Sequence, residues 1–123
     1  MLLNLSHHSH TTWPERQRQI ATQRFGAIED MPFPLIPPDW KTADVIAKAD
    51  EMVTDILGKY GAQDLTVHVM GEMTLIVSLI LRLQRRHVPC VASTTERIVE
   101  QVSLTERKVI FEFVKFREYE RIQ

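Results

Sequence analysis

The sequence predicts an α/β fold: a Rossmann-like, mostly parallel sheet with helices on both faces and a C-terminal β-hairpin. Two observations support this prediction. Short apolar, β-branched runs alternate along the chain with segments whose apolar residues recur at helical spacing, which is the βαβ pattern of parallel sheets. The last part of the chain instead alternates apolar and charged residues, as hairpins do. Because the chain has 123 residues, we expect one domain over residues 1–123.

The composition excludes several classes of protein. Fifteen Lys and Arg against sixteen Asp and Glu give a net charge of −1, which argues against a protein that coats long nucleic acid. A lone cysteine, Cys90, excludes an internal disulfide. The apolar start Met1–Leu5 is too short for a signal peptide, and no segment approaches the roughly 20 apolar residues of a membrane span. We therefore expect a cytoplasmic protein with no membrane partner.

The first quarter of the chain predicts a strand, a helix and a second strand. Met1–Leu5 is apolar and ends in small polar residues, as a buried strand does. The following helix is expected to begin at Thr12 as N-cap, with Glu15 closing a capping box, and to stop at Gly26. Ala27–Met31 then forms a weak strand.

The proline-rich segment Pro32–Pro38 can be neither helix interior nor central strand, and its apolar residues place it against the body of the protein. Asp39 or Thr42 is expected to cap the next helix. That helix has a clear amphipathic pattern and ends at Gly58 or Gly61.

The second half begins with a strand over Leu65–Met70, which is rich in β-branched residues. The turn Gly71–Thr74 leads into a helix over Leu75–Arg86, whose basic end suits the helix dipole. A fourth strand, Val88–Ala92, is expected to end in small polar residues.

The final segments, Glu96–Val102 and Lys108–Tyr119, partition apolar and charged residues by parity. A hairpin with a long second strand is the simplest interpretation. A helix over Glu96–Val102 is the alternative.

Three polar segments follow predicted strands: Ser6–Thr12, Gly71–Thr74 and Ser93–Arg97. The carboxyl ends of parallel strands meet at one edge of a sheet, where ligands bind in such folds, so we expect these segments to form one site. Glycine, hydroxyl groups and helix N-termini suit a phosphate. The same residues also serve as ordinary helix caps, and the two interpretations are compatible.

Histidines are the candidate reactive groups of the first segment. His7, His8 and His10 invite a metal interpretation, but no Cys or Asp stands beside them in the sequence. Their near-neutral pKa favours phosphate binding or proton transfer instead. His68, in mid-strand, is interpreted as a core or interface residue, and Cys90 as a buried thiol. P-loop, GxGxxG and GxSxG patterns are absent from the sequence.

Three stretches resemble one family: Asn4–His8 (NLSHH), Gly71–Thr74 (GEMT) and Ala92–Glu100 (ASTTERIVE). They resemble small CRISPR-associated Rossmann-fold (CARF-type) proteins, including the stand-alone ring nucleases of type III systems. Related small bacterial proteins open with an NLSNHP-like stretch and end in an FVRFREY-like strand. The chain has Phe113–Tyr119 (FVKFREY) in the second place, and His8 departs from the first pattern.

This resemblance implies a homodimer that binds a cyclic oligoadenylate across its two-fold axis. It also implies cleavage by attack of a ribose 2′-hydroxyl on the adjacent phosphate, with no metal and no cofactor. Ser6 and the Gly71–Thr74 turn would cradle phosphate, and Thr94, Thr95 and Arg97 would close the pocket. The predicted site comprises catalytic His7, His10 and Glu72 and ligand-binding Ser6, His8, Thr11, Gly71, Met73, Thr74, Ser93, Thr94, Thr95 and Arg97.

Two other functions remain open from the residues alone. One is a sensor or sink that binds the messenger without cleaving it, or a dimerisation module that uses the apolar strand Val109–Tyr119. The other is a small enzyme acting on another nucleotide or phospho-sugar. The chain length predicts no appended effector domain.

Overall fold

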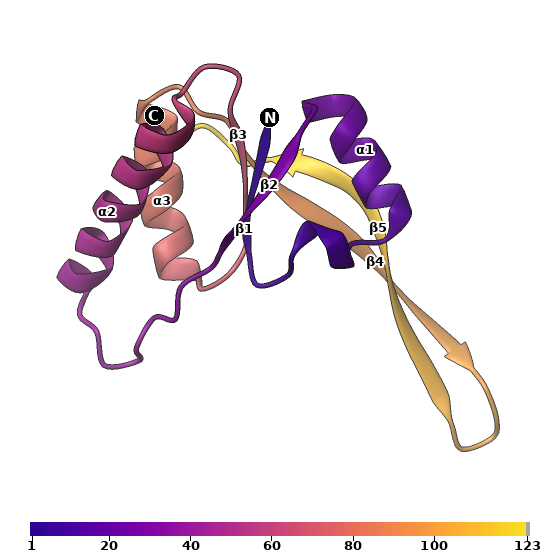
Figure 1. Ribbon diagram of the computed structural model, residues 1–123. Helices are drawn as coiled ribbons and strands as arrows, with labels where there is room; N and C mark the ends of the chain where they lie inside the picture. The colour runs from indigo at the N-terminus through magenta and orange to yellow at the C-terminus, as the bar shows by residue number, and fades with distance from the viewer. Residues whose placement is uncertain (123) are drawn as a thin grey trace.

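A five-stranded sheet separates one helix from the other two in the computed structural model, which describes residues 1–122 (Figure 1). The strands are β1 (Leu2–Ser6), β2 (Ile28–Pro32), β3 (Thr66–Val69), β4 (Cys90–Gln101) and β5 (Arg107–Glu118). The helices are the short 3-10 helix η1 (His10–Thr12), α1 (Glu15–Phe25), α2 (Thr42–Tyr60) and α3 (Met73–Arg85). The predicted fold class is confirmed: α/β, mostly parallel, with helices on both faces and a C-terminal strand pair.

The strand order is β2-β1-β3-β4-β5. The first four strands run parallel, and β5 pairs antiparallel with β4. From β1 the chain moves outward to β2, and α2 then carries it back across the sheet to β3 on the other side of β1. The direction of winding therefore switches between β1 and β3, which is where open α/β sheets leave a crevice at the carboxyl ends of their strands.

The alternation of side chains in β1 separates two cores. Leu3 and Leu5 pack in the larger core beneath α2 and α3. Leu2 packs in a smaller core on the other face, which includes Trp13 and Phe116 and is covered by α1. Asn4 and Ser6 point to the same face of the sheet as Leu2, and both are buried although they are polar. The α1 side of the sheet therefore has a polar floor at its carboxyl edge.

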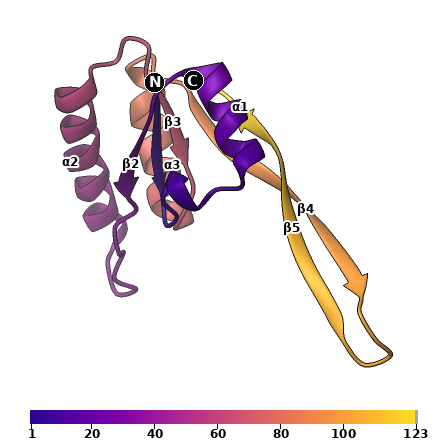
Figure 2. The same cartoon turned by 45° about the vertical axis from the view of Figure 1, so that its right-hand side comes forward.

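The predicted loop Ser93–Arg97 is wrong, because these residues lie inside the long strand β4. The expected fourth strand and the first hairpin strand are one continuous strand, since β5 supplies a pairing partner for each residue as far as Gln101. The hairpin itself is confirmed, and the alternative helix over Glu96–Val102 is not formed. Figure 2 shows the far part of β4 and β5 projecting from the body as a two-stranded ribbon.

The predicted N-terminal cap of α1 is also wrong. Thr12 does not cap α1: it lies in η1, and its hydroxyl donates to the carbonyl of Ser9. Pro14 is the N-cap and makes no side-chain capping bond, so Glu15 closes no capping box. The end of α1 at Gly26 is confirmed.

Helix α2 begins at Thr42 and its N-cap is Lys41, so the prediction that Asp39 or Thr42 caps this helix is wrong. The Asp44 carboxylate accepts a hydrogen bond from the Lys41 backbone N–H at 2.9 Å and so satisfies that N–H from inside the first turn. The last residue of the helix is Tyr60, and of the two predicted ends, Gly58 and Gly61, it is Gly61 that forms the C-cap, with a φ of 72° in the region that favours glycine. The preceding proline segment lies against the body only in part: Phe33 is buried in the larger core and Ile36 packs against it, whereas Leu35 is 91% exposed.

Candidate functional site

A pocket of about 590 Å³ opens at the carboxyl ends of β1 and β3. It lies at the topological switch point, where such sheets bind ligands. Its lining combines hydroxyls, imidazoles and aromatic or apolar groups and includes no Asp, Glu, Lys or Arg. The lining residues are Ser6, His7, His8, Thr12, Trp13, Pro14, Gln17, His68, Met70, Gly71 and Ser93.

A chain of hydrogen bonds crosses the floor of this pocket from β1 to β4. Asn4 and His68 are register partners on adjacent strands, and Asn4 Oδ1 lies 2.9 Å from His68 Nδ1. On the other side of the ring, His68 Nε2 lies 3.1 Å from Ser93 Oγ. Asn4 and His68 are buried, whereas Ser93 is half-buried and borders the pocket.

The protonation of His68 follows from its surroundings. Burial lowers the pKa of His68 to about 4, so the ring is neutral at neutral pH. Asn4 Oδ1 can only accept, so His68 Nδ1 carries the proton and Nε2 is left as an acceptor for the Ser93 hydroxyl. The rings of Trp13 and Phe116 stand edge-on to His68, with centroids 5.3 and 5.7 Å away. Burial and ring packing fix the imidazole in one orientation.

The amide of Asn4 also shapes the loop that follows β1. Its Nδ2 donates to the carbonyl of His8 at 2.7 Å and to Asp30 Oδ1 at 2.9 Å. The Ser6 hydroxyl donates to Asn4 Oδ1 at 2.8 Å. The Asn4 amide therefore takes part in four hydrogen bonds within the protein. These bonds hold the loop on one side of Asn4 and His68 on the other.

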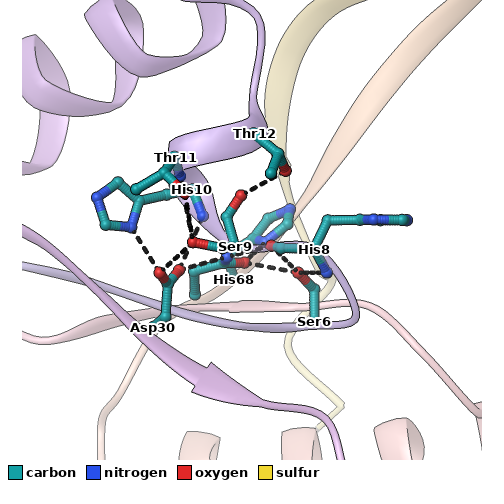
Figure 3. A network of polar contacts seen from close by, with 9 residues as sticks. Ser6, His8, Ser9, His10, Thr11, Thr12, Asp30 and His68 are labelled. Carbon is teal, nitrogen blue, oxygen red and sulfur yellow. Dashed lines mark hydrogen bonds and ion pairs between the residues drawn. The ribbon is translucent and has the colours of Figure 1, made fainter.

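Asp30, in the middle of β2, anchors the rest of that loop (Figure 3). Its carboxylate accepts from the backbone N–H of His10, from the His10 ring at 2.9 Å and from the Ser9 hydroxyl at 2.7 Å. Partial burial opposes ionisation, but the hydrogen bonds from His10, Ser9 and Asn4 prevail and lower the pKa of Asp30 to about 2. The carboxylate is therefore ionised at any physiological pH.

The loop histidines divide into two groups. His7 and His8 are exposed and line the pocket, and the His7 ring packs against Phe33 at 5.1 Å. His10 is held by Asp30 and lies outside the lining. The loop thus presents two imidazoles to a ligand and uses the third for structure.

The amides at the start of α3 bind a side chain of the protein itself. Glu72 is the N-cap, and its carboxylate accepts from the backbone N–H groups of Thr74 at 3.1 Å and Leu75 at 2.8 Å. The Thr74 hydroxyl and then the Leu75 amide lower the pKa of Glu72. Glu72 is thus the cap of α3, and these two amides are occupied by its carboxylate rather than left open for a phosphate.

The structure brings together only part of the predicted site. The pocket contains Ser6, His7, His8, Gly71 and Ser93. The other predicted residues lie outside its lining. His10 and Thr11 lie in η1, Glu72, Met73 and Thr74 lie at the start of α3, and Thr94, Thr95 and Arg97 lie along β4.

Sequence reasoning missed Asn4 and Asp30 as site residues and assigned His68 only a structural place. One sequence signal could have found two of them. Asn4 interrupts the apolar run Leu2–Leu5 and His68 interrupts the apolar run Val67–Met70, and these runs are neighbours in a parallel sheet. Asp30 lies in a short exposed strand and gives no comparable signal.

Cys90 does not line this pocket. Cys90 is buried, and desolvation raises the pKa of its thiol to about 12. Among residues 1–122, no group of three or more His, Cys, Asp or Glu side chains is placed to hold a metal ion. Within the same residues, no helix is long and apolar enough to cross a membrane.

Comparison with known proteins gives a family match. A family model described as "Uncharacterized protein MJ1673 family" matches residues 1–117. No curated protein and no solved structure matches the chain.

Proposed function

The chain belongs to the MJ1673 family, and we propose that it binds a cyclic oligoadenylate in the pocket at the ends of β1 and β3 and cleaves it. Cleavage follows the chemistry that the CARF-type resemblance implies: attack of a ribose 2′-hydroxyl on the adjacent phosphate, without metal or cofactor. Such a ring nuclease would damp type III CRISPR signalling by removing the messenger.

The composition of the pocket lining is the observation that supports this proposal best. Hydroxyls and the imidazoles of His7 and His8 can donate to phosphate oxygens, and no carboxylate borders the pocket to repel them. The exposed His7 ring, held against Phe33, offers a flat face to a purine. A lining without carboxylates permits an anionic ligand that is held by hydrogen-bond donors.

The size of the pocket supports a dimer. At about 590 Å³ it lies within the range of roughly 300–1,000 Å³ typical of small-molecule sites. One copy would therefore enclose part of a cyclic oligonucleotide. A two-fold dimer presents the same groups to both halves of a symmetric ring, so a second copy would complete the site.

The projecting ribbon is the surface we assign to this second copy. An isolated two-stranded ribbon is marginally stable in water, yet its outer part exposes Val99, Val109 and Phe111, the last to 62%. These three apolar residues share one face, since Val99 pairs with Val109 and Arg97 with Phe111. The ribbon also carries both signs of charge, which suits a self-complementary contact between identical copies.

Replacing Phe111 by glutamate is expected to convert the protein from a dimer to a monomer. Phe111 contributes little to the body of the protein because most of its ring is exposed, so the monomer should stay folded. Sedimentation over a range of concentrations measures the change, with Glu112→Gln on the opposite face of the ribbon as the control. A wild-type protein that remains monomeric at high micromolar concentration would refute the dimer.

The function is tested with labelled cyclic tri-, tetra- and hexa-adenylate, following both retention of the ring and formation of linear product without added metal. We expect one ring to be retained and cleaved. His7→Asn should weaken retention about tenfold, the loss of one charge-assisted hydrogen bond. The control is His87→Asn, because His87 lies at the opposite edge of the sheet and has a positive φ that asparagine tolerates.

The outcomes of this assay separate the alternatives. Retention without product indicates a sink or sensor rather than an enzyme. If no ring is retained, the messenger proposal is wrong. If His87→Asn reduces retention as much as His7→Asn does, the site lies elsewhere on the molecule.

A further inference from the structure

From the hydrogen-bonded chain Asn4–His68–Ser93, we propose that Ser93 is the catalytic hydroxyl of the pocket. In this arrangement His68 accepts its proton, and Asn4 is the positioning residue that fixes the His68 tautomer. The inference rests on the proposed function and deepens it by naming the group that removes the proton from the attacking 2′-hydroxyl.

The order of donors and acceptors gives the chain a direction. Asn4 Oδ1 accepts from His68 Nδ1 over 2.9 Å, which leaves His68 Nε2, 3.1 Å from Ser93 Oγ, as the acceptor. A serine whose hydroxyl donates to a neutral imidazole, itself oriented by a third group, is the activated hydroxyl found in unrelated hydrolases. Here the third group is an amide rather than a carboxylate.

The Asp30 carboxylate is linked to His68 through the Asn4 amide. The Asn4 amide that orients His68 also donates to Asp30 Oδ1 at 2.9 Å. When His68 takes up a proton, the positive ring is therefore linked through one amide to a carboxylate that is ionised. This link stabilises the imidazolium without placing a second charge in the buried floor.

The position of Ser93 distinguishes the Asn4–His68–Ser93 hydrogen bonds from a buried network that serves only the structure. A purely structural His68 would need no partner that borders a cavity. Ser93 is half-buried in the strand β4 and lines the same pocket as His7 and His8. Its Oγ also lies 3.0 Å from the thioether of Met70, which can accept only weakly. The hydroxyl is thus within reach of both a ligand and a base.

The proton transfer balances as follows. The ribose 2′-hydroxyl donates to Ser93 Oγ. As the bond from O2′ to phosphorus forms and the bond from phosphorus to O5′ breaks, the 2′ proton passes to Ser93 Oγ, and the Ser93 proton passes to His68 Nε2. The departing O5′ takes a proton from solvent, and His68 later returns its proton to solvent through Ser93. The product is a linear oligoadenylate with a cyclic phosphate and a 5′-hydroxyl.

Turnover and retention of the cleaved ring are compared for Ser93→Ala, Ser93→Thr and wild type. We expect Ser93→Ala to lower kcat by about 10²- to 10³-fold, the usual effect of losing a general base, while ring retention changes less than threefold. Ser93→Thr keeps a hydroxyl and should recover most of the turnover. Thr66→Ala, a hydroxyl removed at the amino end of β3, is the control. Turnover of Ser93→Ala at the wild-type rate would overturn the proposal.

A second measurement needs no ligand and keeps the two proposals distinguishable. Nitrogen-15 NMR of the His68 ring in the ligand-free protein should show a protonated Nδ1 and an unprotonated Nε2. Loss of the Ser93 hydroxyl in Ser93→Ala should shift the Nε2 resonance. A proton on Nε2 would overturn the relay even if the ring is bound and cleaved. If no ring binds, the proposed function fails, while the NMR result still decides the direction of the hydrogen-bonded chain.

Discussion

Replacing Asn4 by alanine is expected to lower the free energy of unfolding by about 3 kcal/mol. The Asn4 side chain is buried and contacts His68, Ser6, His8 and Asp30. Its loss leaves the His68 ring without its partner at Nδ1 and leaves a small cavity in the floor. A buried group left unsatisfied costs roughly 1–3 kcal/mol, and the cavity adds to this cost.

Urea unfolding measures this change, with Ser78→Ala as the matched control. Ser78 on α3 is also a buried polar residue, but its hydroxyl only accepts a bond from Arg82, which keeps its ion pair with Asp50. We therefore expect Ser78→Ala to cost less than about 1 kcal/mol. If the two variants lose the same stability, the Asn4 network is not the organising element of the floor.

Replacing Gly71 by alanine is expected to destabilise the protein by about 2 kcal/mol and to reshape the pocket. A Cβ at this position would lie 2.5 Å from the edge of the Phe33 ring, closer than two carbon atoms can approach. Phe33 is buried in the larger core and supports the His7 ring, so its displacement changes both packing and lining. Overpacking of this kind typically costs about 1–3 kcal/mol.

Gly58→Ala is the matched control, and its expected effect has the opposite sign. Gly58 lies within α2, and a Cβ there meets nothing within 4 Å. Alanine should therefore stabilise the helix by roughly 0.5–1 kcal/mol. In a Phe33→Ala background the cost of Gly71→Ala should nearly vanish. If Gly71→Ala costs as much in that background as in wild type, the contact with Phe33 is not the cause.

The sequence was sufficient to predict the fold class because its signals are local. Strand and helix patterns alternate, the glycines Gly26 and Gly61 end their helices, and the proline segment interrupts both patterns. The position of the site also followed from the fold, since the carboxyl edge of a parallel sheet is where strand-end residues gather. Ser6, Gly71 and Ser93 are indeed neighbours in the pocket.

The rest of the site depends on long-range contacts that no local pattern records. The pairing of β5 with β4 turns the expected loop Ser93–Arg97 into strand, which moves Arg97 onto the ribbon and leaves Ser93 beside His68. The hydrogen bond from His68 to Asn4 joins residues 64 positions apart. Its existence requires β1 and β3 to be neighbours in register.

The caps show a competition that sequence alone did not resolve. Thr12, Asp39 and Thr42 are all good N-cap residues, yet Pro14 and Lys41 occupy the cap positions. At α1 the hydroxyl of Thr12 bonds backward to Ser9 in a local turn instead. At the start of α2, Asp44 caps from inside the helix.

The central claim is that the pocket at the ends of β1 and β3 is the ligand site. Backbone and histidine side-chain NMR spectra, recorded while each cyclic oligoadenylate is titrated into the protein, test it most directly. We expect the largest shifts at His7, His8, Gly71 and Ser93, with His87 unchanged. Shifts confined to the opposite edge of the sheet around His87, or no shifts with any of the rings, would contradict it.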